Sequence, residues 1–183
     1  MKNPEDQAKI AGITVVAAYP QGSKDIKSST ERVPDYTFGA YSIGLEIDTE
    51  TGALELTDAL LVADVGTVLN PIAHRGQIDG GFVCGLGVAL MEERPLDESG
   101  KPVLNSLGDY KLPTIRDIPP LRTVYVPTSL GSGPFGAKMI GELSNAGVAP
   151  AIANAVYNAV RVRLTSLPLR AEDVYRALHR ENT

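Results

Sequence analysis

The sequence predicts an α+β fold in which a mixed sheet, built around a β-hairpin, packs against two long helices and a C-terminal helix. Three observations in the sequence support this prediction. Two apolar segments flank a short turn, as the strands of a hairpin do. Two later segments begin with residues that favour helix starts, and each runs for several helical turns. The chain then ends in a segment whose apolar residues recur at helical spacing.

The expected strands are short, apolar and rich in β-branched residues. ITVVAAY at 13–19 is expected to form the first strand. Segments 36–48 and 53–64 flank the turn TETG, which ends in Gly52, and are expected to form the hairpin. The second hairpin strand first alternates apolar and polar residues and then ends in LLVA, which is expected to be a buried run. LRTVYV at 121–126 is expected to be a further strand.

The first long helix is expected to begin at Asn70 and Pro71. Asparagine is a good N-cap, and proline suits the first helical position because it lacks an amide hydrogen. We expect this helix to extend to about Glu93. DESGK at 97–101 is expected to be a turn, and 109–120, which contains three prolines, an extended segment.

The second long helix is expected to run from residue 147 to about 163, with Ser144 or Asn145 as its N-cap. A terminal helix is expected over 171–181. Its apolar face is formed by Val174, Ala177 and Leu178. It begins at Arg170-Ala171, which offers no side chain of the usual N-cap type.

The composition limits the classes of partner. The net charge of −5 argues against a nucleic acid or an anionic membrane, since both attract basic surfaces. The apolar stretches are shorter than a membrane span, and residues 1–12 lack the apolar core of a signal peptide. We therefore expect a cytoplasmic protein with no nucleic-acid and no membrane partner. Its length fits a single domain, in which 1–35 form a strand and a mobile polar loop and 36–183 form the main part.

Cys84 is the single cysteine, which excludes a disulfide within the chain. The two histidines, His74 and His179, lie far apart and have no metal-ligand spacing, so we expect no metal held by protein side chains. Cys84 has no histidine close by in sequence. It is therefore expected to be a small buried apolar residue rather than a nucleophile.

The first long helix contains more glycine than a helix normally tolerates. The stretch HRGQIDGGFVCGLGVALMEE at 74–93 holds five: Gly76, Gly80, Gly81, Gly85 and Gly87. Each glycine costs about 1 kcal/mol relative to alanine, so something must offset the loss. One interpretation is tight packing of the helix against its neighbours. The other is a ligand that lies along the N-terminal half, with the amide of Gln77 hydrogen-bonded to it.

Glu142 is isolated at the junction between a glycine-rich loop and an alanine-rich helix, and no charged residue follows it until Arg161. It could be a carboxylate that stabilises the helix start and accepts bonds from backbone amides. The other interpretation is a functional base. Lys138 in the same loop could be solvated or functional. Asp64 is expected to be a turn residue that binds backbone amides rather than a ligand.

Four stretches, in this order, resemble one known family. They are DVGTVLNPIAHRGQIDGGFVCGLGVALMEE; GDYKLPTIRDIPPL; PFGAKMIGE followed by APAIANAVYNAV; and VRLTSLPLRAEDVYRAL. Together they resemble the C-terminal part of the molybdopterin-binding large subunit of the xanthine dehydrogenase, aldehyde oxidase and aerobic carbon monoxide dehydrogenase family. The resemblance covers roughly residues 36 to 180. It departs from the family pattern at Leu143, where many members have proline, and at Cys84, where a second glutamine is common.

The resemblance implies an oxidoreductase that hydroxylates a heterocycle or an aldehyde with oxygen from water. It implies that Glu142 is the catalytic base and that Gln77 contacts the pterin. The implied cofactor-binding set is completed by neighbouring residues of the same motifs: Gly76, Gly80, Gly81, Lys138 and Gly141. Apolar neighbours are expected to withdraw Glu142 from water and so raise its pKa, against the opposing effect of Lys138 and the helix start. These neighbours are Met139, Ile140 and Leu143.

The implied cofactor is a molybdenum–molybdopterin, in a dinucleotide form, shared with segments outside this chain. The implied partners are the remaining segments of that large polypeptide, subunits carrying iron–sulfur and FAD groups, and a small-molecule substrate. The chain would then be a shortened piece or one part of a split subunit, inactive alone, with an exposed apolar surface where the rest docks. Two alternatives remain open: a non-catalytic interaction domain derived from the family, and a carrier that binds an anion at the glycine-rich helix start.

Overall fold

A computed structural model describes most of the chain. The described residues are 6–10, 13–17, 36–104, 106–128, 131 and 133–179. Strands β1 (Asp6–Ile10) and β2 (Ile13–Ala17) pair with each other in an antiparallel two-stranded sheet. The strand predicted from residue 13 is therefore confirmed through Ala17. The predicted mobile loop and the boundary at residue 35 lie outside the described residues.

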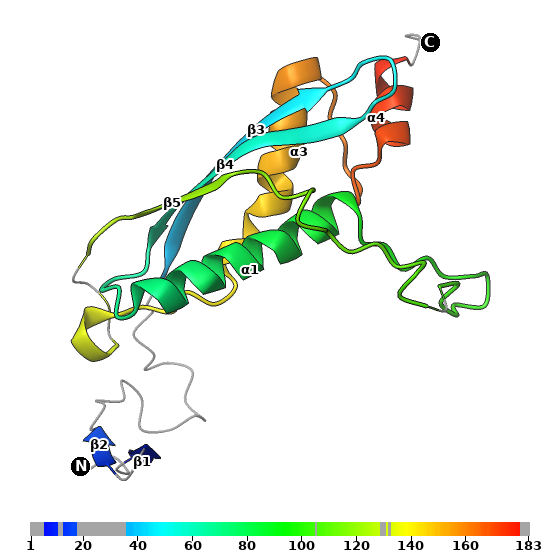
Figure 1. The fold of residues 1–183 in the computed structure, drawn as a ribbon. Helices are drawn as coiled ribbons and strands as arrows, with labels where there is room; N and C mark the ends of the chain where they lie inside the picture. Colours follow the sequence, from blue (N-terminus) through cyan, green and yellow to red (C-terminus); the bar gives the residue numbers. More distant parts are fainter. Residues whose placement is uncertain are drawn as a thin grey trace, which may run out of the picture.

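The main sheet has three strands in the order β3-β4-β5 (Figure 1). Strands β3 (Phe38–Ile47) and β4 (Leu54–Asp64) are antiparallel and form the predicted hairpin. Strand β5 (Leu121–Tyr125) lies parallel to β4 on its other side. Because α1 (Pro71–Leu90) connects β4 to β5, these three elements make a β-α-β unit. The predicted α+β fold, with a mixed sheet built around a hairpin, is confirmed.

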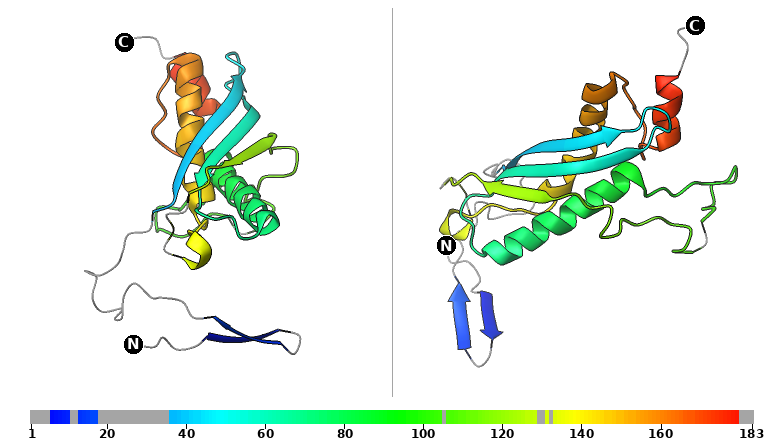
Figure 2. Two further views of the ribbon diagram at one scale, coloured as in Figure 1. Left: turned by 90° about the vertical axis from the view of Figure 1, so that its left-hand side faces the viewer. Right: turned by 45° about the horizontal axis from the view of Figure 1, so that its top comes forward.

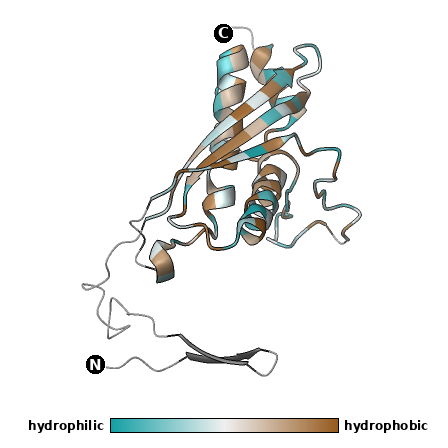
Figure 3. Ribbon diagram, turned by 60° about the vertical axis from the view of Figure 1, so that its left-hand side comes forward, coloured by the Kyte–Doolittle hydropathy of each residue, from teal (hydrophilic) through white to brown (hydrophobic). Residues whose placement is uncertain are grey.

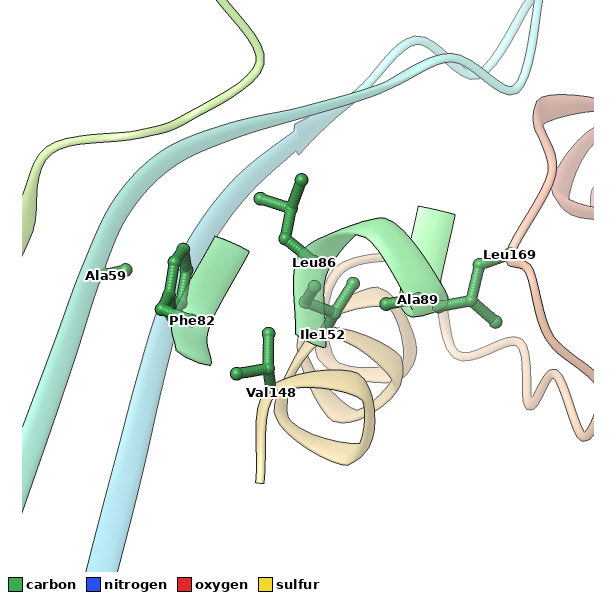
Figure 4. Packing of buried hydrophobic residues seen from close by; sticks show 7 residues of the cluster. All are labelled: Ala59, Phe82, Leu86, Ala89, Val148, Ile152 and Leu169. Atoms are coloured by element: carbon green, nitrogen blue, oxygen red, sulfur yellow. The ribbon is translucent and has the colours of Figure 1, made fainter. Parts of the chain in front are cut away.

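Helix α1 runs along the strands (Figure 2), and with α3 (Val148–Val160) it covers one face of the sheet. The main buried cluster joins β4, α1, α3 and the segment before the last helix (Figure 4). Its members are Ala59, Phe82, Leu86, Ala89, Val148, Ile152 and Leu169. Apolar and polar residues alternate along the strands (Figure 3), as expected for a sheet with one covered face.

The prediction of a buried LLVA run at the end of β4 is only partly correct. Leu61 and Ala63 are fully buried beneath the helices. Leu60 and Val62 point to the other face and are half-buried, because no described element covers that face. A continuous buried run would need helices on both faces of the sheet.

Helix α1 begins as predicted. The side chain of Asn70 accepts a hydrogen bond from the amide of Ala73 at 3.0 Å, and Pro71 occupies the first turn. The helix ends at Leu90, short of the predicted Glu93. The amide of Met91 still donates to the carbonyl oxygen of Gly87, but its backbone has left the helical conformation.

The predicted second long helix is confirmed as α3, which begins one residue after the predicted start at 147, and a separate short helix, α2 (Leu143–Ala146), precedes Gly147. The predicted cap at Ser144 or Asn145 is wrong. The Ser144 hydroxyl donates back to the Gly141 carbonyl oxygen at 3.1 Å, and the residue is buried. Helix α3 ends at Val160 rather than near 163 because Arg161 adopts a left-handed conformation, with φ of 60°.

Helix α4 (Ala171–Leu178) is confirmed, with Val174 fully buried and no capping bond from the Arg170 side chain. The turn at 97–101 is confirmed by Asp97, whose carboxylate accepts the amide of Lys101 at 2.9 Å. The segment 109–120 is not simply extended, because Asp117 closes a turn within it. In the part of the chain that is described, no helix combines the length and apolar character needed to cross a membrane.

Candidate functional site

The loop that precedes Glu142 is held against the end of β4. The amide of Lys138 donates to the Val65 carbonyl oxygen at 2.8 Å, and the amide of Thr67 donates to Gly136 at 3.1 Å. Gly66 lies between these bonds with a φ of +64°, where a side chain would overlap the Gly136 carbonyl oxygen. Glycine is therefore required there both for the conformation and for the close approach of the loop.

A partly buried ion pair reinforces this attachment. The ammonium group of Lys138 lies 2.7 Å from a carboxylate oxygen of Asp64, and the two side chains are 4% and 15% exposed. Asp64 also accepts the Thr128 hydroxyl at 2.6 Å and the Gly66 amide at 3.0 Å. These bonds, above all that from Lys138, hold the pKa of Asp64 at about 2. The expectation that Asp64 binds a backbone amide is confirmed. The Lys138 ammonium group is therefore paired with Asp64 and is not solvated.

The pairing makes the stability of the chain depend on pH. The pKa of Asp64 lies below its ordinary value of 3.8, so its contribution is complete above that value and is lost as the pH falls toward about 2. Asp64→Asn is therefore expected to lower the free energy of unfolding by a constant amount down to about pH 5. The difference from wild type, measured by urea unfolding, should shrink below about pH 4. A difference that stays constant through the acid range would contradict this assignment.

The segment after Lys138 packs on the first half of α1. Ile140 and Leu143 join a second buried cluster formed by Leu61, Ala63, Val65 and Ile78. Ser144 lies so close to Gly81 that a side chain at Gly81 would overlap it. The chain around Glu142 is thus held between the end of β4 and the helix turn that carries Gln77 and Ile78.

Glu142 is exposed at this junction. Its carbonyl oxygen accepts the amides of Asn145 and Ala146 at 3.1 Å each, but its carboxylate makes no capping bond to α2. The structural alternative, a carboxylate bonded to backbone amides at the helix start, therefore has no support from the described contacts. The expected desolvation by neighbours is also wrong for the chain alone. Met139 is 81% exposed, whereas Ile140 and Leu143 turn into the core and away from the carboxylate.

The glycines of α1 fall into two groups. Gly81, Gly85 and Gly87 pack tightly, against Ser144, Val148 and Glu92 respectively, so the packing interpretation holds for them. A side chain built at Gly76 or Gly80 would meet no described atom within 4 Å, and the same is true of Gly141 beside Glu142. Packing within the described chain does not explain these three glycines.

The open glycines of α1 belong to an exposed, uncharged strip of the helix. We call it the glycine face: Gly76, Gln77, Gly80 and Cys84. Cys84 is exposed, which corrects the expectation that it is buried. The Gln77 amide offers two donors and one acceptor. Bare backbone at Gly76 and Gly80 would let a planar polar group approach closely. Glu142 adds one carboxylate nearby, carried on the segment packed against the same half of α1.

Arg75 and Asp79 hold the turn that carries Gln77. The guanidinium of Arg75 pairs with Asp79 at 2.7 Å and donates to the Leu121 carbonyl oxygen, also at 2.7 Å. Asp79, the acidic residue of GQIDG, is thus paired with Arg75, and it is Arg75 that links α1 to β5. Among the described residues, no group of three histidine, cysteine, aspartate or glutamate side chains is arranged to hold a metal ion.

Sequence reasoning missed the link between Asp64, Thr128 and Lys138. Asp64 and Lys138 are 74 residues apart, and each sits in a stretch that is unremarkable by itself. The one usable signal was the pair of lone charges, each next to a glycine-rich turn.

Comparison with known proteins gives a consistent result. Residues 6–119 match the profile of the molybdopterin cofactor-binding domain. The chain is 32% identical over 146 residues to a probable xanthine dehydrogenase subunit of Bacillus subtilis, covering 80% of this chain and 20% of that protein. It is 36% identical over 135 residues to the aldehyde oxidoreductase molybdenum-binding subunit PaoC of Escherichia coli, covering 73% and 18%.

Among solved structures, quinoline 2-oxidoreductase from Pseudomonas putida superimposes with a TM-score of 0.73 at 32% identity. The match covers 78% of this chain and 19% of that one. The chain thus spans about a fifth of the length of these relatives. The profile match contains the glycine face, whereas Glu142 lies beyond it.

Proposed function

The chain belongs to the molybdopterin cofactor-binding domain family, and from that premise we propose that it is the C-terminal part of the large subunit of a molybdenum hydroxylase. In this proposal, residues 36–183 form one domain that contributes a catalytic base, Glu142, and pterin contacts centred on Gln77. The reaction is hydroxylation of a heterocycle or an aldehyde, with water as the source of oxygen. The proposal rests on the contact pattern of one segment and one helix face.

The observation that carries the proposal is the set of glycines without a packing role. Gly76, Gly80 and Gly141 have open space where a side chain would be. Gly76 adjoins Gln77 and Gly141 adjoins Glu142, and Gly80 follows Gln77 by three residues on the glycine face. In α1 this costs helix stability of about 1 kcal/mol per glycine, with no gain within the described chain. A pterin lying on the glycine face would use that space. The residues present therefore fit the group.

In the assembled enzyme the molybdenum cofactor would supply the oxidation–reduction chemistry. The chain's own residues have simpler tasks. Gln77 would donate and accept hydrogen bonds at the edge of the pterin and so orient it. Glu142 would hold a proton at its carboxylate after removing it from the oxygen donor, as a general base does. Gly81 and Lys138 would support these residues from behind, through Ser144 and Asp64, without touching the cofactor.

The structure also supports a larger assembly. The face of the sheet opposite the helices, the outer sheet face, carries the half-buried Val62 and four exposed apolar residues: Phe38, Ala40, Val124 and Val126. Phe38 is 63% and Val124 50% exposed, and a hollow of ≈ 290 Å³ lies between Phe38, Val62 and Val126. Exposed apolar groups of this size are typical of surfaces that other polypeptide covers. We propose that the rest of the large polypeptide packs on this face.

By the same family reasoning, the cofactor is a molybdopterin in dinucleotide form, and the electron-accepting iron–sulfur and FAD groups lie on partner subunits. A non-catalytic interaction domain would share the apolar outer sheet face but has no use for the open glycines. The anion-carrier alternative is disfavoured by the start of α1. There Asn70 already satisfies the amide of Ala73, and Pro71 has no amide hydrogen to offer.

The glycine face provides the test. In the isolated chain, Gly76→Ala and Gly80→Ala are each expected to raise the free energy of unfolding by about 0.5–1 kcal/mol, because alanine favours helix. In the complex purified from its host, the same changes should lower the molybdenum content, because each methyl group occupies cofactor space. Val88→Ala, at an exposed position farther along the same helix, is the matched control and should leave the molybdenum content unchanged. Full molybdenum occupancy in both glycine variants would overturn the proposal.

A further inference from the structure

We propose that Asp64 and Lys138 form a clamp that positions Glu142, which makes Lys138 a positioning residue and not a contact for cofactor or substrate. The inference rests on the proposed function for the role of Glu142. The geometry of the clamp itself stands independently of that role.

The Lys138 side chain is enclosed by its neighbours. It is 4% exposed, its ammonium group is 2.7 Å from Asp64, and the same group lies 5.5 Å from the centre of the Phe38 ring. Its stem passes over Gly66. A lysine enclosed in this way cannot reach the glycine face without breaking its ion pair, which would leave the partly buried Asp64 carboxylate without its cationic partner.

The segment between Lys138 and Glu142 has few bonds of its own to the sheet. Met139 and Gly141 are exposed, and Gly141 has no side chain to pack. The Thr37 hydroxyl donates to the Met139 carbonyl oxygen at 2.7 Å, and the Leu143 amide and Ser144 hydroxyl donate to the carbonyl oxygens of Ile140 and Gly141. The described backbone bonds that tie the loop to the end of β4 lie at Lys138 and before it. Loosening the clamp would therefore let the segment that carries Glu142 move relative to the end of β4, since a short glycine-containing segment has little stiffness of its own.

A second ion pair on β4 differs from the clamp in its exposure. Asp58 of β4 also pairs with a cation, Arg122, at 2.8 Å, but these side chains are 43% and 65% exposed. Exposed ion pairs contribute little to the stability of a fold and do little to hold a segment in place. Asp58→Asn is therefore a matched control for Asp64→Asn, with the same chemical change at an ion pair that does not anchor the loop.

The first test is amide hydrogen exchange on the purified 183-residue chain, which needs no cofactor. The amides of Leu143, Asn145 and Ala146 donate to carbonyl oxygens of Ile140 and Glu142 and so report on the segment. Asp64→Asn and Lys138→Met should each speed their exchange by about tenfold or more, while the amides of α3 keep their protection. The double variant should be no faster than either single one, because both remove the same interaction. Lys138→Arg should restore most of the protection, and Asp58→Asn should match wild type.

Unchanged exchange in Asp64→Asn, or an equal increase throughout α3, would overturn the clamp.

The second test uses the molybdenum-containing complex, with xanthine, benzaldehyde or quinoline as the probe substrate. Asp64→Asn and Lys138→Met should lower kcat alike, by about 10- to 100-fold, with molybdenum content and KM nearly unchanged. If Lys138 instead contacts the cofactor, Lys138→Met alone will lose molybdenum, and Asp64→Asn will change neither the molybdenum content nor kcat appreciably. Full turnover by Glu142→Gln would defeat the proposed function but would leave the exchange result, and thus the clamp, intact.

Discussion

Glu142→Gln is expected to lower kcat of the assembled, molybdenum-loaded enzyme by about 10²- to 10⁴-fold, the usual contribution of a general base. Glutamine keeps the size of the side chain but cannot accept the proton. The carboxylate is exposed and makes no capping bond, so the stability of the chain should change by less than about 0.5 kcal/mol. The effect would therefore be chemical and not structural.

The measurement is kcat and KM of the purified complex with xanthine, benzaldehyde and quinoline, together with its molybdenum content. Glu55→Gln is the control, because Glu55 is an exposed glutamate of β4 remote from the loop. It should retain full activity. Near-normal turnover by Glu142→Gln, at full molybdenum occupancy, would show that the base is another residue. Loss of molybdenum would mean instead that Glu142 helps to hold the cofactor.

Gly81→Val is expected to lower the free energy of unfolding by about 1–3 kcal/mol or more, as overpacking in a tight contact does. The new side chain would overlap Ser144, which is buried. Relief of the overlap requires α2 to move away from α1. Because α2 starts directly after Glu142, the same movement would displace the carboxylate.

Gly80→Val is the matched control, one residue earlier on the same helix. A side chain at Gly80 meets no described atom, and valine and glycine differ little in helix propensity, so its stability should stay within about 0.5 kcal/mol of wild type. Both variants are compared by urea unfolding. Equal stabilities for the two would show that α1 and α2 do not approach as closely as the structure indicates.

The parts of the fold that the sequence predicted are those set by local chemistry. The hairpin, the Asn70-Pro71 helix start and the last helix each depend on neighbouring residues and are confirmed. The short helix α2 before Gly147 was not predicted. The close approach of the Tyr41 ring from β3, which leaves no room for a side chain at Gly147, could not be read from the sequence because the two residues lie far apart in the chain. Cys84 was misjudged because the average burial of cysteine says nothing about which helix face is covered.

The candidate site, too, was predictable only where it depends on local sequence. The resemblance selects Glu142 and Gln77, and the structure carries them on segments that pack together. The environment of Glu142 could not be inferred from its apolar neighbours, since Ile140 and Leu143 point into the core. The role of Lys138 depends on a partner 74 residues away, a distance at which sequence pattern carries no information.

The central claim, that this chain is part of a molybdenum-containing assembly, is tested most directly by affinity purification of the tagged chain from its own host, with molybdenum assayed in the eluate. We predict stoichiometric molybdenum together with larger polypeptides that supply the rest of the enzyme. Recovery of the chain alone, without molybdenum, would contradict the claim, and the open glycines beside Gln77 and Glu142 would then need another explanation.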